Sequence, residues 1–167
     1  MSGGAFSGFA IVVRPEWTAT GHLTVASFSL LFDLASDALR EHCGIGRGYA
    51  QAHARSIVVV EAHHTYLREA REGDRLRFRT RLLGTALKRL HVFHAMHREG
   101  DADPLATAEL MLVHIDRTTG RAVAFSAKVM ARLSAEHEAH AKAAWPPQAG
   151  RAIARVANGA RAGVTGS

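Results

Sequence analysis

The chain has 167 residues and a mass of 18.0 kDa, enough for one domain with a hydrophobic core and too little for two full domains. Apolar residues make up 47% and charged residues 22%, which excludes a wholly disordered chain. The formal net charge of +6 favours an anionic partner or substrate. No apolar run approaches a membrane span and no secretory leader is visible, so we expect a cytoplasmic protein without membrane contact.

The first part of the chain predicts a short strand followed by one long helix. Residues 10–13 form an apolar run that Pro15 ends, since proline lacks the N–H donor of a central strand. Apolar residues recur at helical spacing over residues 23–42, where Thr20 or Thr24 can cap the start. The apolar stripe is Leu23, Leu30, Leu31, Leu34, Ala35, Ala38 and Leu39, and the opposite side carries Ser29, Asp33, Ser36, Asp37, Arg40 and Glu41.

Residues 56–116 predict three or four consecutive antiparallel strands. The run 57–60 is apolar on both faces, as in a strand that is covered on each side. Residues 75–82 alternate between arginine and core-type side chains, so four arginines face solvent or a partner subunit. Further strands are predicted over residues 90–98, 105–116 and 121–125, with short connections that favour antiparallel neighbours.

The last part predicts a polar surface helix over residues 131–144 and a basic, mobile tail over 148–167, so the domain covers 1–147. The single cysteine, Cys43, lies at the end of the long helix, where the helix dipole disfavours a thiolate, and we interpret it as structural. One apolar helix must be buried, and only a curved antiparallel sheet is large enough to cover it. We therefore predict an α+β fold in which the sheet wraps a long central helix.

This arrangement resembles the hot-dog fold, and short motifs extend the resemblance. The motifs are residues 17–22 directly before the helix, then 61–70, 73–74, 88–94, 105–109 and 114–116. Over about residues 12–133 the chain resembles the 4-hydroxybenzoyl-coenzyme A thioesterase-like group, and within it the thioesterases of carnitine breakdown, which are associated with betainyl-coenzyme A. The resemblance implies a hydrolase of small acyl-coenzyme A thioesters. It also implies a homodimer or homotetramer with the site between subunits, and no cofactor beyond the coenzyme A of the substrate.

One departure from the family pattern leaves two functions open. The family loop before the Gly-His pair commonly carries a catalytic aspartate, whereas residues 17–22 contain no acid. Either another acid replaces it, or the chain is a non-catalytic protein that binds acyl thioesters. A hot-dog dehydratase fits less well, because its histidine and acid arrangement is not apparent.

Thioester hydrolysis needs charge stabilisation at the carbonyl oxygen and an activated water. We place the carbonyl at residues 21–24, because the free amides and the dipole of the helix point there. Gly21 would let the backbone approach the substrate, and His22 would donate a hydrogen bond or orient water; alternatively, both only shape the turn. Glu61 is the predicted base, since burial in an apolar strand would make it more basic, and an ion pair with an arginine is the alternative.

The remaining binding residues follow from the chemistry of the substrate. The predicted substrate-binding residues are Trp17, Thr18, Thr24, His63 and Tyr66. A quaternary ammonium would meet Trp17, Tyr66 or Glu61, although buried aromatic rings are also common in plain cores. Lys88 and Arg89 are predicted to bind the phosphates of coenzyme A, and a solvated basic edge is the alternative.

Metal and nucleic-acid binding are not predicted. His63 and His64 are adjacent in a strand and point to opposite faces, and the spacing of His91, His94 and His97 also alternates faces. The arginines are spread along the chain without a helix-turn-helix, zinc-finger or ribonucleoprotein motif. We therefore expect no metal ion and no nucleic-acid partner.

Overall fold

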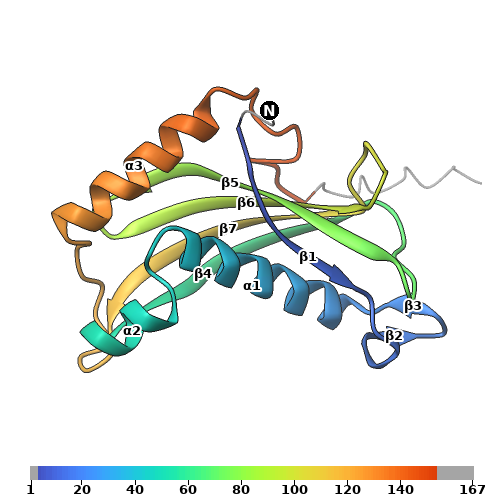
Figure 1. Ribbon diagram of the computed structural model, residues 1–167, viewed down its shortest axis with the longest axis horizontal. Coiled ribbons are helices and arrows are strands. Elements are labelled where there is room, and N and C mark those ends of the chain that lie inside the picture. Colours follow the sequence, from blue (N-terminus) through green and yellow to red (C-terminus); the bar gives the residue numbers. More distant parts are fainter. Residues whose placement is uncertain (1–3, 154–167) are drawn as a thin grey trace, which may run out of the picture.

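The computed structural model describes residues 4–153, which form a curved antiparallel sheet with one long helix on its inner face and a second helix along one side (Figure 1). The strands are β1 (Phe6–Val12), β2 (Thr18–Ala19), β3 (His22–Leu23), β4 (Arg55–Tyr66), β5 (Arg75–Ala86), β6 (Arg89–Arg98) and β7 (Ala106–Asp116). The helices are α1 (Val25–His42), α2 (Arg47–His53) and α3 (Ala127–Ala141), with a 3-10 turn at Pro15–Trp17. Within residues 4–153, no helix is long and apolar enough to cross a membrane.

The order of the large sheet is β1-β5-β6-β7-β4, and every neighbouring pair is antiparallel. Strands β5, β6 and β7 form the predicted meander. The expectation that β4 and β5 are neighbours is wrong, because β4 pairs with β7 at the far edge of the sheet. The predicted strand over residues 121–125 is also wrong: only Ala122 forms a bridge there, with Ile115.

Helix α1 packs its apolar side on the inner face of the sheet, as predicted. The fully buried side chains Leu31, Phe32 and Ala35 face core residues of β5, β6 and β7. Thr24 is the cap, since its Oγ1 accepts the Ser27 N–H at 3.2 Å. Two details differ from the predicted stripe, because Leu30 is 43% exposed and Ser36 is buried.

Ser36 is buried because it belongs to a polar network under α1. Its hydroxyl donates to the Phe32 carbonyl at 3.0 Å and also lies 2.8 Å from Nε2 of His94, which is wholly buried. Because the Ser36 hydroxyl hydrogen is already donated to the Phe32 carbonyl, Nε2 of His94 donates its hydrogen to the Ser36 oxygen. Nδ1 of His94 then carries no hydrogen and accepts from the Thr80 hydroxyl at 2.8 Å. Burial lowers the pKa of His94 to about 3, with smaller contributions from Arg40 and His64. The helix is thus joined to β5 and β6 by a neutral histidine.

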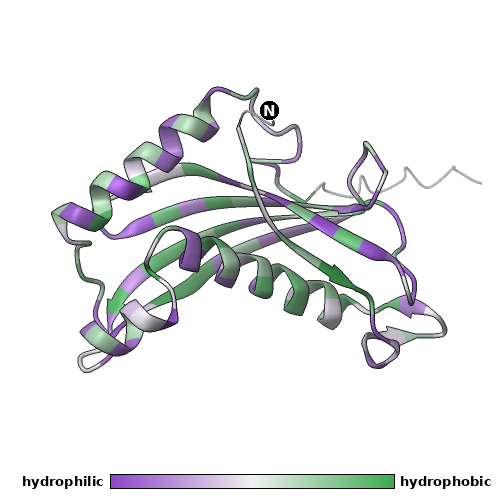
Figure 2. Ribbon diagram, in the orientation of Figure 1, coloured by the Kyte–Doolittle hydropathy of each residue, from purple (hydrophilic) through white to green (hydrophobic). Residues whose placement is uncertain are grey.

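The outer face of the sheet carries the predicted arginines. Along β5, exposed arginines alternate with buried side chains, and the alternation of hydropathy is visible in Figure 2. Arg81 differs from the others, since its guanidinium donates to the carbonyls of His140 and Ala143, both at 3.0 Å, at the end of α3. This contact caps the C-terminus of α3.

Helix α3 covers the part of the β5 edge that β1 leaves open. Its His140 Nδ1 accepts the Leu82 N–H at 2.9 Å, and His137 Nε2 donates to the Leu83 carbonyl at 3.0 Å. The helix begins four residues earlier than predicted and is not only a surface helix, because Val129, Leu133 and His140 are buried. These histidines satisfy strand groups that would otherwise form an open edge.

Strand β4 has no such cover among residues 4–153. It was expected to be covered on both faces, yet Val59 is 45% and Val60 is 58% exposed. A β-bulge interrupts its pairing with β7 between Val59 and Glu61, so Val60 is an extra residue.

The start of the predicted tail contacts the sheet. The Gly150 N–H donates to the Glu109 carboxylate at 2.7 Å, and Ala149 is buried. Residues 151–153 are exposed and residues 154–167 lie outside the described residues, so the domain boundary and the mobile tail stay predictions. Cys43 is buried as well, and burial together with Glu136 raises the pKa of its thiol to about 12, which supports its interpretation as structural.

The buried His94 predicts an acid-sensitive fold. The folded-state pKa of about 3 lies below the ordinary 6.5, so the unfolded chain binds a proton first as the pH falls. The contribution of His94 to stability is complete above pH 6.5 and is lost by about 1.4 kcal/mol per pH unit between the two pKa values. We expect His94→Gln to flatten the pH dependence of the unfolding free energy between pH 6 and 4, measured with urea. The exposed His53→Gln variant is the control, and equal slopes for all three proteins would contradict this.

Candidate active site

The start of α1 is held in place by the small hairpin of β2 and β3. Ala19 pairs with His22, and the two turn residues between them, Thr20 and Gly21, have φ angles of 52° and 83°. Two positive φ angles are characteristic of a tight type I′ hairpin turn, in which glycine is favoured. Leu23 anchors the hairpin, because it is buried and its N–H donates to the Ala70 carbonyl at 2.8 Å. The backbone just before α1 is therefore fixed from both sides.

The N-terminal end of α1 is open to solvent. Thr24 caps the Ser27 N–H, but the N–H groups of Val25 and Ala26 have no acceptor among residues 4–153. Both residues are exposed, and Val25 is 63% exposed. Free amides and the positive end of the helix dipole together form a site that favours negative charge. Gly21 and Thr24, two of the predicted site residues, border these amides.

His22 lies at this helix end beside a carboxylate that sequence reasoning missed. Its Nδ1 is 3.1 Å from Oε2 of Glu69, and its side chain is 38% exposed. Glu69 is brought there because His22 forms a bridge with Arg71 in the segment between β4 and β5. The same carboxylate lies 3.6 Å from the Arg71 guanidinium. The only sequence signal was its place in the motif 61–70, which carries the family resemblance without assigning Glu69 a role.

Trp17 and Thr18 contribute to the shape of this loop. The Trp17 carbonyl accepts the Thr24 N–H at 3.1 Å, and the Arg14 guanidinium lies 5.0 Å from the centre of the Trp17 ring. The Thr18 hydroxyl donates to the Pro15 carbonyl at 2.8 Å. One face of the indole is therefore already in contact with a cation, and the substrate-binding roles of both residues stay predictions.

Aromatic side chains gather between the first two turns of α1 and the end of β4. The ring centre of Phe28 is 5.2 Å from that of Tyr66, and the Phe32 and His64 ring centres are 5.4 Å apart. His64 Nδ1 lies 3.3 Å from the Tyr66 hydroxyl and 3.4 Å from Oγ of Ser29. Burial, with a smaller contribution from the neighbouring His63, lowers the pKa of His64. His64, rather than the predicted His63, is the histidine of this strand that faces α1.

Glu61 and His63 lie on the outer face of the sheet, away from α1. Across the strand pair Glu61 is opposite Met111 and His63 is opposite Glu109, and all four line a cleft of about 310 Å³. The reason is the bulge at Val60: one extra residue reverses which side chains point inward from there on. Glu61 is also exposed, so the expected burial of this carboxylate is wrong. The structure does not bring Glu61 to the open end of α1 within one chain.

The outer-face cleft contains a second close pair of side chains. His91 Nε2 lies 2.7 Å from Oε1 of Glu109, and the other carboxylate oxygen accepts the Gly150 N–H. In the part of the chain that the structure describes, no group of three or more His, Cys, Asp or Glu side chains is arranged to hold a metal ion.

The predicted coenzyme A residues are at the opposite end of the sheet from His22. Lys88 and Arg89 are exposed at the turn between β5 and β6, whereas His22 is beside Arg71, just before β5 begins. Strand β5 separates the two places by roughly 35 Å at about 3.3 Å per residue. Their role stays a prediction, and one substrate molecule could use both groups only if they came from different subunits.

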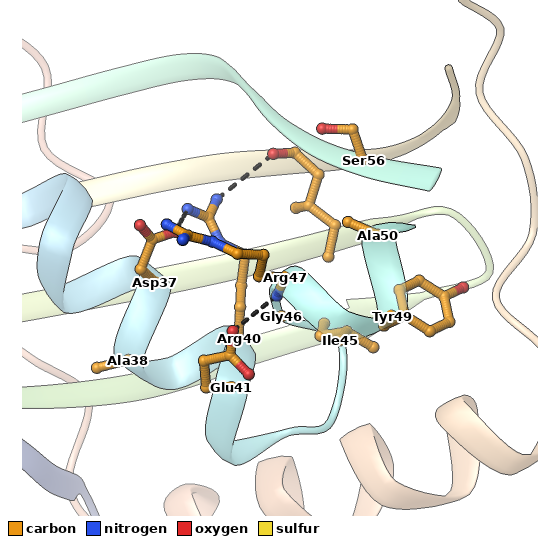
Figure 3. A pocket seen from close by; sticks show the side chains of 11 residues that line it. Asp37, Ala38, Arg40, Glu41, Ile45, Gly46, Arg47, Tyr49, Ala50 and Ser56 are labelled. Atoms are coloured by element: carbon orange, nitrogen blue, oxygen red, sulfur yellow. Dashed lines mark hydrogen bonds and ion pairs between the residues drawn. The ribbon is translucent and has the colours of Figure 1, made fainter. Parts of the chain in front are cut away.

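A further cleft of about 620 Å³ lies near the C-terminal end of α1, between α1, α2 and the start of β4 (Figure 3). Its charged groups contact one another. Arg40 contacts Asp37 and donates to the Ile57 carbonyl at 3.4 Å, and Glu41 accepts the Arg47 N–H at 2.7 Å. The sequence did not predict α2, which forms one wall. Arg40 is about 22 Å along α1 from the open end, so this cleft and the helix start are separate places.

Comparisons with known proteins give a consistent result. The model of the thioesterase-like superfamily matches residues 13–133. A betainyl-CoA thioesterase of Pseudomonas aeruginosa is 39% identical over 142 residues, which are 84% of this chain and 89% of that protein. An L-carnitine dehydrogenase/betainyl-CoA thioesterase of Rhizobium meliloti is 38% identical over 84% of this chain, but this chain spans only 28% of that longer relative.

Solved structures agree with the sequence relatives. A putative thioesterase of Pseudomonas putida has a TM-score of 0.80 at 33% identity, covering 92% of this chain and 98% of that one. A hypothetical protein of Staphylococcus aureus, solved in complex with CoA, has a TM-score of 0.84 at 24% identity, covering 93% and 98%, and shows the fold alone. The predicted hot-dog fold is confirmed.

Proposed function

The chain belongs to the thioesterase-like superfamily, and we propose that it hydrolyses a small acyl-coenzyme A thioester at the open end of α1, with betainyl-coenzyme A as the leading candidate substrate. The observation that carries the site assignment is the pair of free amides at Val25 and Ala26, beside His22. When water adds to a thioester, negative charge develops on the carbonyl oxygen. Fixed N–H donors at that position stabilise the transition state more than the ground state.

The betainyl group fits the aromatic side chains next to these amides. Only one methylene group separates its carbonyl carbon from its quaternary nitrogen, so the cation has to lie within about one helical turn, about 5.4 Å, of the amides. Phe28 is in the first turn of α1, and Tyr66, which is 43% exposed, lies against it. Aromatic faces attract quaternary ammonium groups. The lowered pKa of His64 favours its neutral form, which does not repel a cation.

The edge strand β4 supports a homodimer or homotetramer. On the side away from β7, its backbone groups face no other strand within residues 4–153. Val59 and Val60 on β4 and Leu30 on α1 add exposed apolar surface to this edge. Antiparallel pairing of β4 with its copy would bury these side chains and close the edge. The α1 start and the Tyr66 region would then lie near the subunit boundary.

Release of free coenzyme A thiol tests the proposed activity. We expect turnover with short acyl-coenzyme A esters, with the highest kcat/KM for betainyl-coenzyme A. The panel contains betainyl, acetyl, isovaleryl, 3,3-dimethylbutanoyl and aromatic esters, and thiol is followed with a chromogenic disulfide.

The alternative function predicts a different outcome of the same assay. A non-catalytic acyl-thioester-binding protein would bind coenzyme A esters saturably, measured by calorimetry, and release no thiol from any of them. The absence of an acid from residues 17–22 motivates this alternative. Binding without thiol release would therefore contradict the proposed hydrolase and favour the binding protein.

Tyr66 should distinguish charged from neutral acyl groups. We expect Tyr66→Leu to lower kcat/KM for betainyl-coenzyme A by about 3- to 30-fold, because a cation–π contact contributes about 0.5–2 kcal/mol. The 3,3-dimethylbutanoyl ester has the same shape without the charge, so its kcat/KM should change less. Tyr66→Phe keeps the aromatic face and is the matched control. Equal losses for both esters would count against a cation contact at Tyr66.

The β4 edge predicts the oligomeric state. Light scattering after gel filtration should give two or four times the chain mass of 18.0 kDa. Val60→Lys should shift the protein toward the monomer, because a charge would be buried in the paired edge. Leu87→Lys is the control, since Leu87 is 62% exposed at the far end of β5. A wild-type protein with the mass of one chain would refute the assembly.

A further inference from the structure

We infer that His22 is the general base of the proposed hydrolysis and that Glu69 is the residue that positions it. This inference deepens the proposed function and rests on it. It supplies a base at a place where residues 17–22 contain no acid. Neither residue is contributed by a partner, since both lie at the open end of α1 in the same chain.

The fold fixes the pair through backbone contacts on both sides. His22 follows the Thr20–Gly21 turn and pairs with Ala19, while on its other side it forms a bridge with Arg71. The bridge places Glu69, two residues earlier, next to the imidazole ring. The side-chain contact of 3.1 Å is therefore a consequence of the chain path and does not depend on a long flexible loop.

The burial of the ring indicates which nitrogen is available. Nδ1 lies 3.1 Å from the Glu69 carboxylate, but no hydrogen bond joins the two groups in this conformation, so the contact is one of charge. Nδ1 is fully buried although 38% of the side chain is exposed, so the exposed part of the ring lies away from Glu69. Within residues 4–153, Nε2 has no hydrogen-bond partner. Nε2 is therefore the nitrogen that can take a proton from water, and the Glu69 carboxylate lies on the other side of the ring, where it stabilises the imidazolium that forms.

Other carboxylates of the chain lie in less suitable places for activating a water at the start of α1. Glu61 faces the opposite side of the sheet, and Asp37 contacts Arg40 near the far end of α1. Glu16 belongs to the loop, but it is exposed and lies 3.8 Å from Arg14. Among the carboxylates of residues 4–153, only Glu69 contacts a histidine beside the free amides of α1.

The reaction balances with water alone. Nε2 of His22 removes a proton as the water oxygen bonds to the thioester carbon, and the amides of Val25 and Ala26 stabilise the oxyanion. The carbonyl forms again as the carbon–sulfur bond breaks. The imidazolium returns its proton to the departing sulfur, giving coenzyme A thiol, and the acid product ionises in water. Glu69 stays ionised and stabilises the imidazolium between the two proton transfers.

The test compares kcat and KM of variants on the best substrate of the wild-type protein. His22→Gln should lower kcat by about 100-fold or more, the usual contribution of general-base catalysis, with KM changed less than about threefold. Glu69→Gln should lower kcat by about 10- to 100-fold with KM changed less than about threefold, because the imidazolium that forms during the reaction loses its carboxylate, and Glu69→Asp should recover part of the loss. A double variant no slower than His22→Gln would show that Glu69 acts through His22.

A matched control pair exists elsewhere in the chain. His42 Nε2 lies 3.1 Å from Glu136, the same contact distance, at the other end of α1, and His42→Gln should retain wild-type kcat. Imidazole in solution should partly restore the activity of His22→Ala.

Two outcomes would overturn the inference while leaving the hydrolase intact: an active wild-type protein with His22→Gln within threefold of its kcat, or with Glu69→Gln within threefold of its kcat. A wild-type protein that releases no thiol would instead overturn the proposed function and this inference together.

Discussion

The structure depends on the burial of one face of α1 against the inner face of the curved sheet. Leu31, Phe32 and Ala35 are almost wholly buried there, and the Ser36–His94–Thr80 network joins the helix to two strands. Such a contact fixes the rotation and the axial position of α1 at the same time, because hydrogen bonds are directional whereas apolar packing is not. The open helix end is consequently held at one place relative to the hairpin before it and the segment after β4.

The two edges of the sheet differ in how their backbone groups are covered. On the β5 side, β1 pairs with the first half of the strand and α3 supplies histidine donors and acceptors to the second half. On the β4 side nothing within residues 4–153 performs this task. The chain thus protects the β5 side and leaves the β4 edge free, and because β4 carries Tyr66 beside the start of α1, subunit pairing at this edge would lie close to the proposed site.

Local patterns made much of the fold predictable. The 3.6-residue period of α1 and the arginine alternation of β5 are properties of short segments, and the structure has both. Strand order could not be predicted, because β4 finds its partner β7 across residues far apart in the chain. The role of Glu69 was missed for a similar reason. Its contact with His22 joins the β2–β3 hairpin to the segment between β4 and β5, and no spacing pattern in the sequence indicates a contact between segments so far apart. For Glu61, the apolar run before it predicted burial, whereas the residue is exposed on the outer face of the sheet.

The bulge at Val60 means that chain length, and not only residue identity, decides which chemistry each side of β4 presents. If Val60 took a regular place in the ladder, Glu61, His63 and Thr65 would turn toward α1 and His64 and Tyr66 would point outward, without a change in any of those side chains. Deleting Val60 would instead remove the extra residue and keep these side chains on their present faces, so a gap at this position in a relative preserves the side chains that line the helix. Two sequences that share every polar residue of the strand could still line their helix with different ones.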